Sequence, residues 1–304
     1  MKNKIFLFVA LSMAMLISSC SSSVKNTEVE ADILIIKKTD VERDGLKGKV
    51  KTVKMLSVGG DGKLWQNIRL FDDKGNRVES RFYRSDNSLE SKDTFRYDDK
   101  GNKVEECSFN GDGSLIYKYV CQYDNQGNML EKCEYGDDGS LRDKWIYQYG
   151  VKGNMLETCT YGADSTLRAK DICQYDNQGN MLEMCTYTSD GTLICKCQYD
   201  KQGNMLEKCA YTSDGGSLTN KWVYQYDGQG REIEECVYGG NGSFLYKYIS
   251  QYDDKENRIE KCRYNADGSL YAKYTYKYDS KGNITEEPDD MHESTIVYEY
   301  EYYE

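Results

Sequence analysis

The chain has 304 residues, of which 38% are hydrophobic and 30% charged, and its formal net charge is −11. So small an apolar share excludes a thick globular core, and the negative charge disfavours contact with phosphate backbones, so no nucleic-acid partner is expected. The 28 Tyr and 27 Gly, beside a single Pro, favour strands and tight turns over helices or disorder.

The N-terminal residues have the pattern of an export signal. Lys2 and Lys4 precede an apolar run over residues 5–17, which is too short for a comfortable membrane span. The run ends in Ile-Ser-Ser-Cys at residues 17–20, which resembles the lipobox of bacterial lipoproteins. That resemblance implies cleavage before Cys20 and acylation of its thiol. The alternative is an ordinary secretory leader with a chance cysteine.

The chain then repeats itself every 26 residues, apart from one interval of 24 and one of 27. An aromatic residue followed by Asp or Gly marks each copy, at Phe71-Asp72, Tyr97-Asp98, Tyr123-Asp124, Tyr149-Gly150, Tyr175-Asp176, Tyr199-Asp200, Tyr226-Asp227, Tyr252-Asp253 and Tyr278-Asp279. A Gly-Asn step follows, as at Gly127-Asn128, and an Asp-Gly step comes half a period later, as at Asp138-Gly139. Because these residues favour turns, each copy contains two turns and therefore one hairpin.

Two strands lie between the turns of each copy, for example over residues 129–135 and 141–149. Their alternation puts Trp145 and Tyr147 on one face and Lys144 on the other. The sequence therefore predicts an all-β fold. We expect a long antiparallel meander of about nine 26-residue hairpin repeats, forming a single twisted or curled, solenoid-like β-strip.

The motif Tyr-Asp-x-x-Gly-Asn followed by an apolar residue resembles the YD repeat of RHS-type proteins. The Asp-Gly-Ser-Leu hairpins are similar to the MORN-like repeats of small bacterial envelope proteins, and the likeness covers roughly residues 45–287. RHS proteins wrap a strip of hairpins into a shell around a toxin. This chain has few repeats and no toxin module or self-cleaving core, which argues against a closed shell. The resemblance implies a β-strip with an extracellular, interaction-type role.

These features predict three parts. Residues 1–19 form a lipoprotein signal peptide, 20–40 a lipidated cysteine with a flexible tether, and 41–304 a YD-like β-hairpin repeat domain with an N-terminal cap and a C-terminal closing strand. The lipobox resemblance implies a location in the cell envelope, lipid-anchored to the outer membrane on its periplasmic or surface face. Contact with the membrane is expected through the lipid anchor alone.

Two charged columns follow the repeat. The acidic column is Glu79, Glu105, Glu131, Glu157, Glu183, Glu207, Glu234, Glu260 and Glu286, and the basic one is Lys92, Lys118, Lys144, Lys170, Lys196, Lys221, Lys247 and Lys273. We expect a cross-strand ladder, in which each pair contributes about 0.2–1 kcal/mol; a polyvalent charged surface for a ligand is the alternative. Equivalent carboxylates lack the distinct environments of a catalytic pair, and no catalytic motif is present, so no enzyme and no catalytic residue is predicted.

The cysteines form a third column at Cys107, Cys133, Cys159, Cys185, Cys209, Cys236 and Cys262, with extra copies at Cys121, Cys173, Cys195 and Cys197. Equivalent strands lie about 9.6 Å apart, whereas a disulfide needs Cα atoms within about 7 Å, so column members should stay unpaired and serve as small buried hydrophobes. There is no Cys-x-x-Cys pair, and His292 is the single His. Neither a metal nor a cofactor is predicted, although Cys195 and Cys197 point both thiols to one face.

Aromatic side chains share a further column at Trp145, Trp222, Tyr119, Tyr248 and Tyr274. In a one-layer sheet such rings pack across strands, but an exposed stripe can also stack on sugar rings or hold a protein partner. These five residues are the candidate binding surface. A site that breaks the repeat is expected at its irregular copies, around Tyr149-Gly150 and residues 195–199.

The sequence thus predicts a non-enzymatic cell-envelope lipoprotein that presents a repeat-built β-sheet surface for binding a protein or a glycan. The alternatives are an antitoxin or immunity-like protein, by analogy with MORN-like and RHS systems, and a structural spacer of the envelope. Both alternatives rest on fold analogy or on architecture, not on a site.

Overall fold

The computed structural model describes residues 38–58, 64–289 and 294–304. Residues 37–304 form one compact unit, separate from residues 1–36. The predicted signal peptide, Cys20 and most of the predicted tether lie outside the described residues, as does His292. Within the part of the chain that the structure describes, no helix is long and apolar enough to cross a membrane.

The described residues form one short helix, α1 (Asp40–Arg43), and a single sheet. Its strands are β1 (Val50–Val58), β2 (Leu64–Phe71), β3 (Arg77–Tyr83), β4 (Leu89–Tyr97), β5 (Lys103–Asn110), β6 (Leu115–Tyr123), β7 (Met129–Gly136), β8 (Leu141–Tyr149), β9 (Met155–Gly162), β10 (Leu167–Tyr175), β11 (Met181–Thr188), β12 (Leu193–Tyr199), β13 (Met205–Tyr211), β14 (Leu218–Tyr226), β15 (Glu232–Gly239), β16 (Phe244–Tyr252), β17 (Arg258–Asn265), β18 (Leu270–Thr275), β19 (Lys277–Tyr278), β20 (Ile284–Asp289) and β21 (Ser294–Tyr302).

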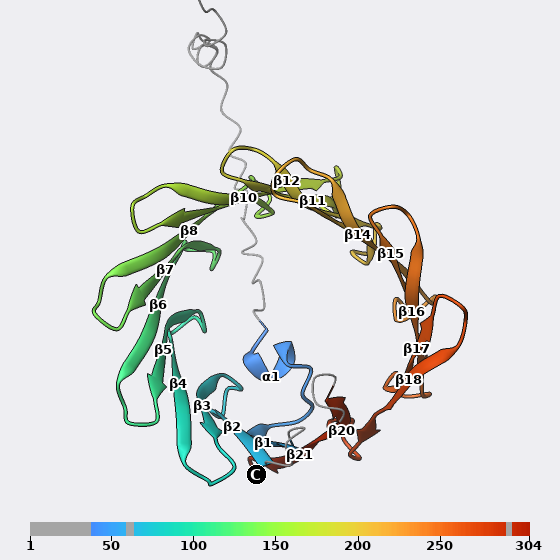
Figure 1. The fold of residues 1–304 in the computed structure, drawn as a ribbon. Helices are drawn as coiled ribbons and strands as arrows, with labels where there is room; N and C mark the ends of the chain where they lie inside the picture. The colour runs from blue at the N-terminus through green and yellow to red at the C-terminus, as the bar shows by residue number, and fades with distance from the viewer. Residues whose placement is uncertain (1–37, 59–63, 290–293) are drawn as a thin grey trace, which may run out of the picture. The chain divides into compact units, whose positions relative to one another are not determined.

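Each strand from β1 to β18 pairs antiparallel with its neighbour in the chain, which confirms the predicted meander. β18 and β19 are two parts of one strand interrupted at Tyr276: the first pairs with β17 and the second with β20. The closing strand β21 pairs with β20 and returns to β1. The compact unit is therefore a ring of hairpins (Figure 1). The predicted curled strip is confirmed, and its ends meet where β21 pairs with β1.

The ring closes because the last strand finds an apolar partner. Val41, Val50, Val53 and Phe71 form a buried cluster, and tyrosines at alternate positions of β21 pack against it. The hydroxyl of Tyr303, just after β21, donates to the main-chain oxygen of Phe71 at 2.7 Å. These contacts join residues more than 200 positions apart, so no local pattern in the sequence predicts them.

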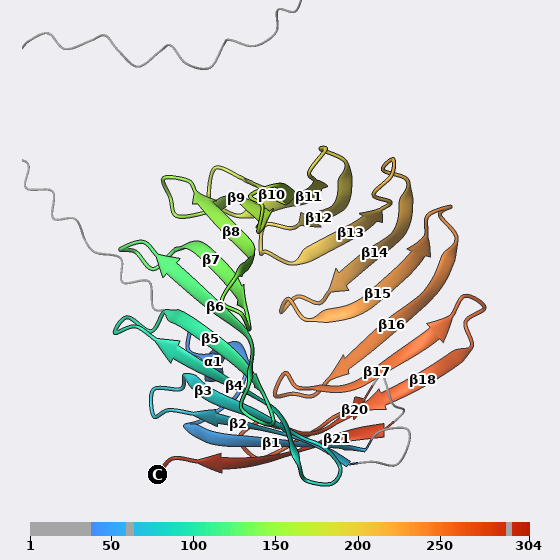
Figure 2. The same cartoon turned by 60° about the vertical axis from the view of Figure 1, so that its left-hand side comes forward.

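The register tells which residues face the inside of the ring. Helix α1 lies within the ring (Figures 1 and 2), and Asp44, which follows it, pairs with Arg69 on β2 at 3.4 Å. Directly paired residues share a face of a sheet. Arg69 on β2 pairs with Ser80 on β3, and Ser80 pairs with Asp93 on β4, so all three residues face the inside of the ring. The inward-facing residues of the later strands follow from the same pairing, strand by strand. The residues between them face outward.

The Tyr-Asp-x-x-Gly-Asn motif builds one rim of the ring. In one copy, Asp124 accepts hydrogen bonds from the main-chain N–H groups of Gln126 and Asn128, and Gly127 adopts φ +85°. The tyrosine of the motif then reaches the start of the neighbouring strand, because the hydroxyl of Tyr149 at the end of β8 donates to the main-chain oxygen of Met129 on β7 at 2.9 Å. The same bond is made by Tyr97, Tyr123, Tyr175, Tyr226, Tyr252 and Tyr278. Each motif thus fixes a turn and fastens one hairpin to the next.

Candidate functional site

The outer face repeats almost unchanged from hairpin to hairpin. Its lysines and glutamates meet across neighbouring strands at Nζ–Oε distances of 2.5 to 3.0 Å, in the pairs Lys118–Glu105, Lys144–Glu131, Lys170–Glu157, Lys196–Glu183, Lys221–Glu207, Lys247–Glu234 and Lys273–Glu260. The predicted ladder is confirmed. The first copy differs, since Glu79 pairs with Arg81 and the Lys92 ammonium lies over the ring of Phe109.

The cysteine column belongs to the same outer ladder. The Cys133 thiol donates to Glu131 Oε1 at 3.2 Å, and five further copies repeat this contact. The hydrogen bond from Lys144 lowers the pKa of Glu131, while burial raises the pKa of the Cys133 thiol. All eleven described cysteines are free, and most of the column is buried. The prediction that most cysteines of the column are buried is confirmed.

The inner face differs from hairpin to hairpin. Beside the constant lysine of the ladder, one inner position holds in turn Asp93, Tyr119, Trp145, Asp171, a cysteine of β12, Trp222, Tyr248 and Tyr274. All five predicted surface residues lie on this face and are half-buried. The structure brings them together in two groups, on β6–β8 and on β14–β18, which lie on opposite sides of the ring (Figure 1).

The first group is a cation held between two rings. The Lys132 ammonium lies 3.7 Å from the centroid of the Tyr119 ring and 5.1 Å from that of Trp145, and the two rings are 6.1 Å apart. The Tyr119 hydroxyl donates to Glu134 Oε2 at 2.8 Å. Among the described residues, Lys132 makes no ion pair with a carboxylate.

The second group repeats this theme with other residues. Lys208 lies 5.4 Å from the Trp222 ring centroid, and Lys261 lies 4.1 Å from that of Tyr248. Lys261 also faces Tyr274 directly across β17 and β18, and it forms an ion pair with Glu235 at 3.6 Å. Burial raises the pKa of Glu235 despite this pair. Both groups therefore combine half-buried rings with ammonium groups.

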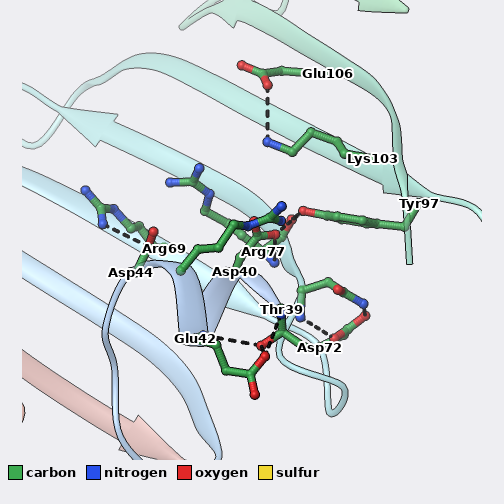
Figure 3. A network of polar contacts seen from close by, with 12 residues as sticks. Thr39, Asp40, Glu42, Asp44, Arg69, Asp72, Arg77, Tyr97, Lys103 and Glu106 are labelled. Carbon is green, nitrogen blue, oxygen red and sulfur yellow. Dashed lines mark hydrogen bonds and ion pairs between the residues drawn. The ribbon is translucent and has the colours of Figure 1, made fainter. Parts of the chain in front are cut away.

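Sequence reasoning missed a polar network around α1 (Figure 3). Asp40 is 4% exposed, accepts from the main-chain N–H of Arg77 at 2.9 Å and from the Tyr97 hydroxyl, and pairs with Arg43. Burial would raise the pKa of Asp40, but the hydrogen bonds from Tyr97 and Arg77 outweigh burial and hold it below its ordinary value. One signal was present in the sequence: a Thr-x-x-Glu capping box begins at Thr39.

Within the described ranges, no three His, Cys, Asp or Glu side chains gather closely enough to hold a metal ion. A hollow of about 820 Å³ lies between two motif turns and is lined by Asp200, Asn204, Tyr224 and Asp227 among others. A smaller apolar hollow of about 130 Å³ lies between Trp65 and Phe82.

No family model matches this chain, and no curated protein matches it. Among solved structures, it is similar to a Photorhabdus luminescens Tc holotoxin pore, with 12% identity, a TM-score of 0.33, and coverage of 74% of this chain and 15% of that one. It is also similar to a porin-like protein from Bacteroides uniformis, with 8% identity, a TM-score of 0.38 and coverage of 84% and 98%. It is similar as well to a porin-like protein from Bacteroides vulgatus, with 13% identity, a TM-score of 0.33, and coverage of 83% of this chain and 99% of that one. Such likeness concerns the repeat-built β structure alone.

Proposed function

We propose that the chain is a non-enzymatic lipoprotein of the cell envelope, anchored through Cys20, whose curled sheet binds an acidic glycan on its inner face. One observation carries the proposal. Seven outer lysines are neutralised by glutamates of the ladder, whereas Lys132 and Lys208 on the inner face lie over aromatic rings and pair with no carboxylate among the described residues.

The inner ammonium groups favour an anionic ligand. An ammonium over an aromatic ring gains about 0.5–1 kcal/mol at exposed sites, which positions the side chain but leaves its charge uncompensated. A carboxylate brought beside Lys132 would meet that charge in a half-buried setting, where screening by water is weaker than on the outer surface. The ladder lysines cannot offer this, because Lys144 already holds Glu131 at 2.5 Å.

The rings favour a sugar as the carrier of that carboxylate. Tyr119 and Trp145 are half-buried, so part of each apolar surface stays open to stack against the C–H face of a sugar ring. A few polar groups beside the rings, such as Glu134, can orient hydroxyl groups. The core of a protein interface is instead depleted of charged residues. The mixture of rings and charges on this face therefore fits a uronic-acid glycan better than a protein partner.

A glycan array with acidic and neutral members, followed by calorimetry with oligogalacturonate, tests the binding. Lys132→Ala and Trp145→Ala should each weaken binding at least tenfold. Lys144 and Ile146 flank Trp145 in the sequence and face outward, so they provide matched controls. Lys144→Ala and Ile146→Ala should leave the affinity for the glycan unchanged. Binding only to protein ligands, or equal losses on both faces, would contradict the proposal. Shortened glycan after incubation would contradict a non-enzymatic role.

The anchor is tested separately, because it rests on residues 17–20 of the sequence. Cells fed an alkyne analogue of palmitate should label the wild-type chain, and Cys20→Ala should lose the label. Labelling that persists in the variant would contradict acylation at this cysteine without bearing on the glycan site.

A further inference from the structure

The shortened repeat gathers sulfur atoms on the inner face. β12 is two residues shorter than β10, and it carries Cys195 and Cys197 on the side that faces into the ring. Their Sγ atoms are 3.9 Å apart. Met184 on β11 is paired directly with Cys197, and on its other side directly with Cys173 on β10. Three adjacent strands thus bring four sulfur-bearing side chains together.

The geometry of the two thiols disfavours a disulfide. Residues two apart in an extended strand have Cα atoms about 6.8 Å apart, at the upper limit for a disulfide, whose sulfur atoms must close to about 2.05 Å. Cys195 and Cys197 are held in this extended form by pairing on both sides, with β11 and with β13. An ion that bridges the gap leaves the strand undisturbed.

We infer that Cys195, Cys197 and Met184 form a three-sulfur site for a soft monovalent metal ion, Cu(I). Thiolate and thioether ligands together select Cu(I) over harder ions. Metal–thiolate bonds of about 2.3 Å that reach sulfur atoms 3.9 Å apart enclose an angle of about 115° at the ion. That angle is close to the trigonal arrangement of three ligands, and Met184, paired directly with Cys197 on the neighbouring strand, offers the third sulfur on the same face.

The surroundings suit such an ion. Both binding thiols give up a proton to solvent when Cu(I) enters, because the thiolate is the form that binds the ion. The ion keeps its oxidation state, and the bis-thiolate complex carries one net negative charge. Lys208 is paired directly with Cys197 and supplies a compensating ammonium. Cys197 is 2% exposed, whereas Cys195 is half-buried, which leaves a route of entry from inside the ring.

The purified full chain, kept reduced, is titrated anaerobically with Cu(I) against the chelator bathocuproine disulfonate. One Cu(I) per chain should resist a chelator concentration that strips the double variant Cys195→Ser/Cys197→Ser, and Met184→Leu should weaken retention about tenfold. The outer-face variant Cys133→Ser/Cys159→Ser should match the wild type, because those thiols bond to ladder glutamates. Retention should also rise as the pH is raised from 6 to 8, since protons leave on binding.

X-ray absorption of the copper-loaded wild type keeps the test independent of variant folding. Three sulfur neighbours around one copper would support the site. Retention that survives the double variant, displacement of Cu(I) by an equal amount of Zn(II), or a Cys195–Cys197 disulfide in the air-purified chain would overturn it. Lys208 lies beside Cys197 and also over the Trp222 ring, so the two proposals share this residue. The variants that test the copper site leave Lys132, Trp145 and Lys208 intact, so loss of copper binding in them is distinguishable from loss of glycan binding.

Discussion

The outer and inner faces of the sheet are made by alternate residues of the same strands, but they repeat to different degrees. Outside, each hairpin from β7 to β18 presents the same Glu, Lys and Cys, bonded to one another in the same way. Inside, the position beside the ladder lysine changes from Asp93 to Tyr119 to Trp145. Residues that recur in every copy hold neighbouring hairpins together, whereas residues that differ between copies can be specific to a ligand.

The polar network around α1 differs from the rest of the inner side because it stabilises the fold. Removing its central residue, Asp40, should therefore have the largest effect on the free energy of unfolding. Asp40→Ala removes the acceptor for Arg77, Tyr97 and Arg43, which leaves buried donors unpaired. We expect a loss of about 3 kcal/mol in the free energy of unfolding. Chemical denaturation measures it. Asp44→Ala, at a more exposed ion pair, should cost less than about 1 kcal/mol; equal losses would show that the network is not special.

The rim tyrosines should come next. Tyr149→Phe keeps the ring but removes the bond to Met129, which should cost about 1 kcal/mol. Tyr199, in the shortened repeat, makes no such main-chain bond within the described residues, so Tyr199→Phe is the matched control and should cost less. Equal midpoints in urea for the two variants would contradict the role given to the motif tyrosine.

Each Lys–Glu pair of the outer ladder should contribute less to the free energy of unfolding than a rim tyrosine does. That contribution should depend on pH. Lys144 lowers the pKa of Glu131 in the folded chain, so the pair stabilises the fold above the unfolded value of about 4.3. That stability is lost as the pH falls through the folded pKa. Glu131→Gln should cost about 0.5 kcal/mol at neutral pH and less in acid. Urea denaturation at pH 7 and pH 3 measures this, and a cost that does not shrink in acid would be evidence against the ladder.

Substituting an inner lysine should have a small effect on stability and a large one on binding. Lys132→Ala should lower the free energy of unfolding by no more than about 1 kcal/mol, the contribution of its cation–π contacts, while lowering glycan affinity at least tenfold. Lys144→Ala should do the reverse, with a measurable loss of stability and unchanged affinity. If both substitutions changed the same property, the division of labour between the faces would be wrong.

Periodic columns made much of this fold predictable. Glu131 and Lys144 recur with the hairpin, so their ladder and the cysteines beside them follow from spacing alone. Ring closure was missed because β21 meets β1 across almost the whole chain. The proximity of Met184 to Cys197, thirteen positions away, could not be predicted because it depends on the pairing of β11 with β12. Contacts that depend on long-range pairing or on a local deletion leave no periodic trace.

Carbon-13 methyl labels on the lysines would observe both faces in one titration with oligogalacturonate. If the inner face binds the glycan, the NMR signals of the inner lysines Lys132, Lys208 and Lys261 should shift as ligand is added. The signals of the ladder lysines Lys144, Lys170 and Lys221 should not shift. Shifts of the ladder lysine signals without shifts of the inner ones would contradict the claim that the inner face binds the ligand while the outer face stabilises the sheet.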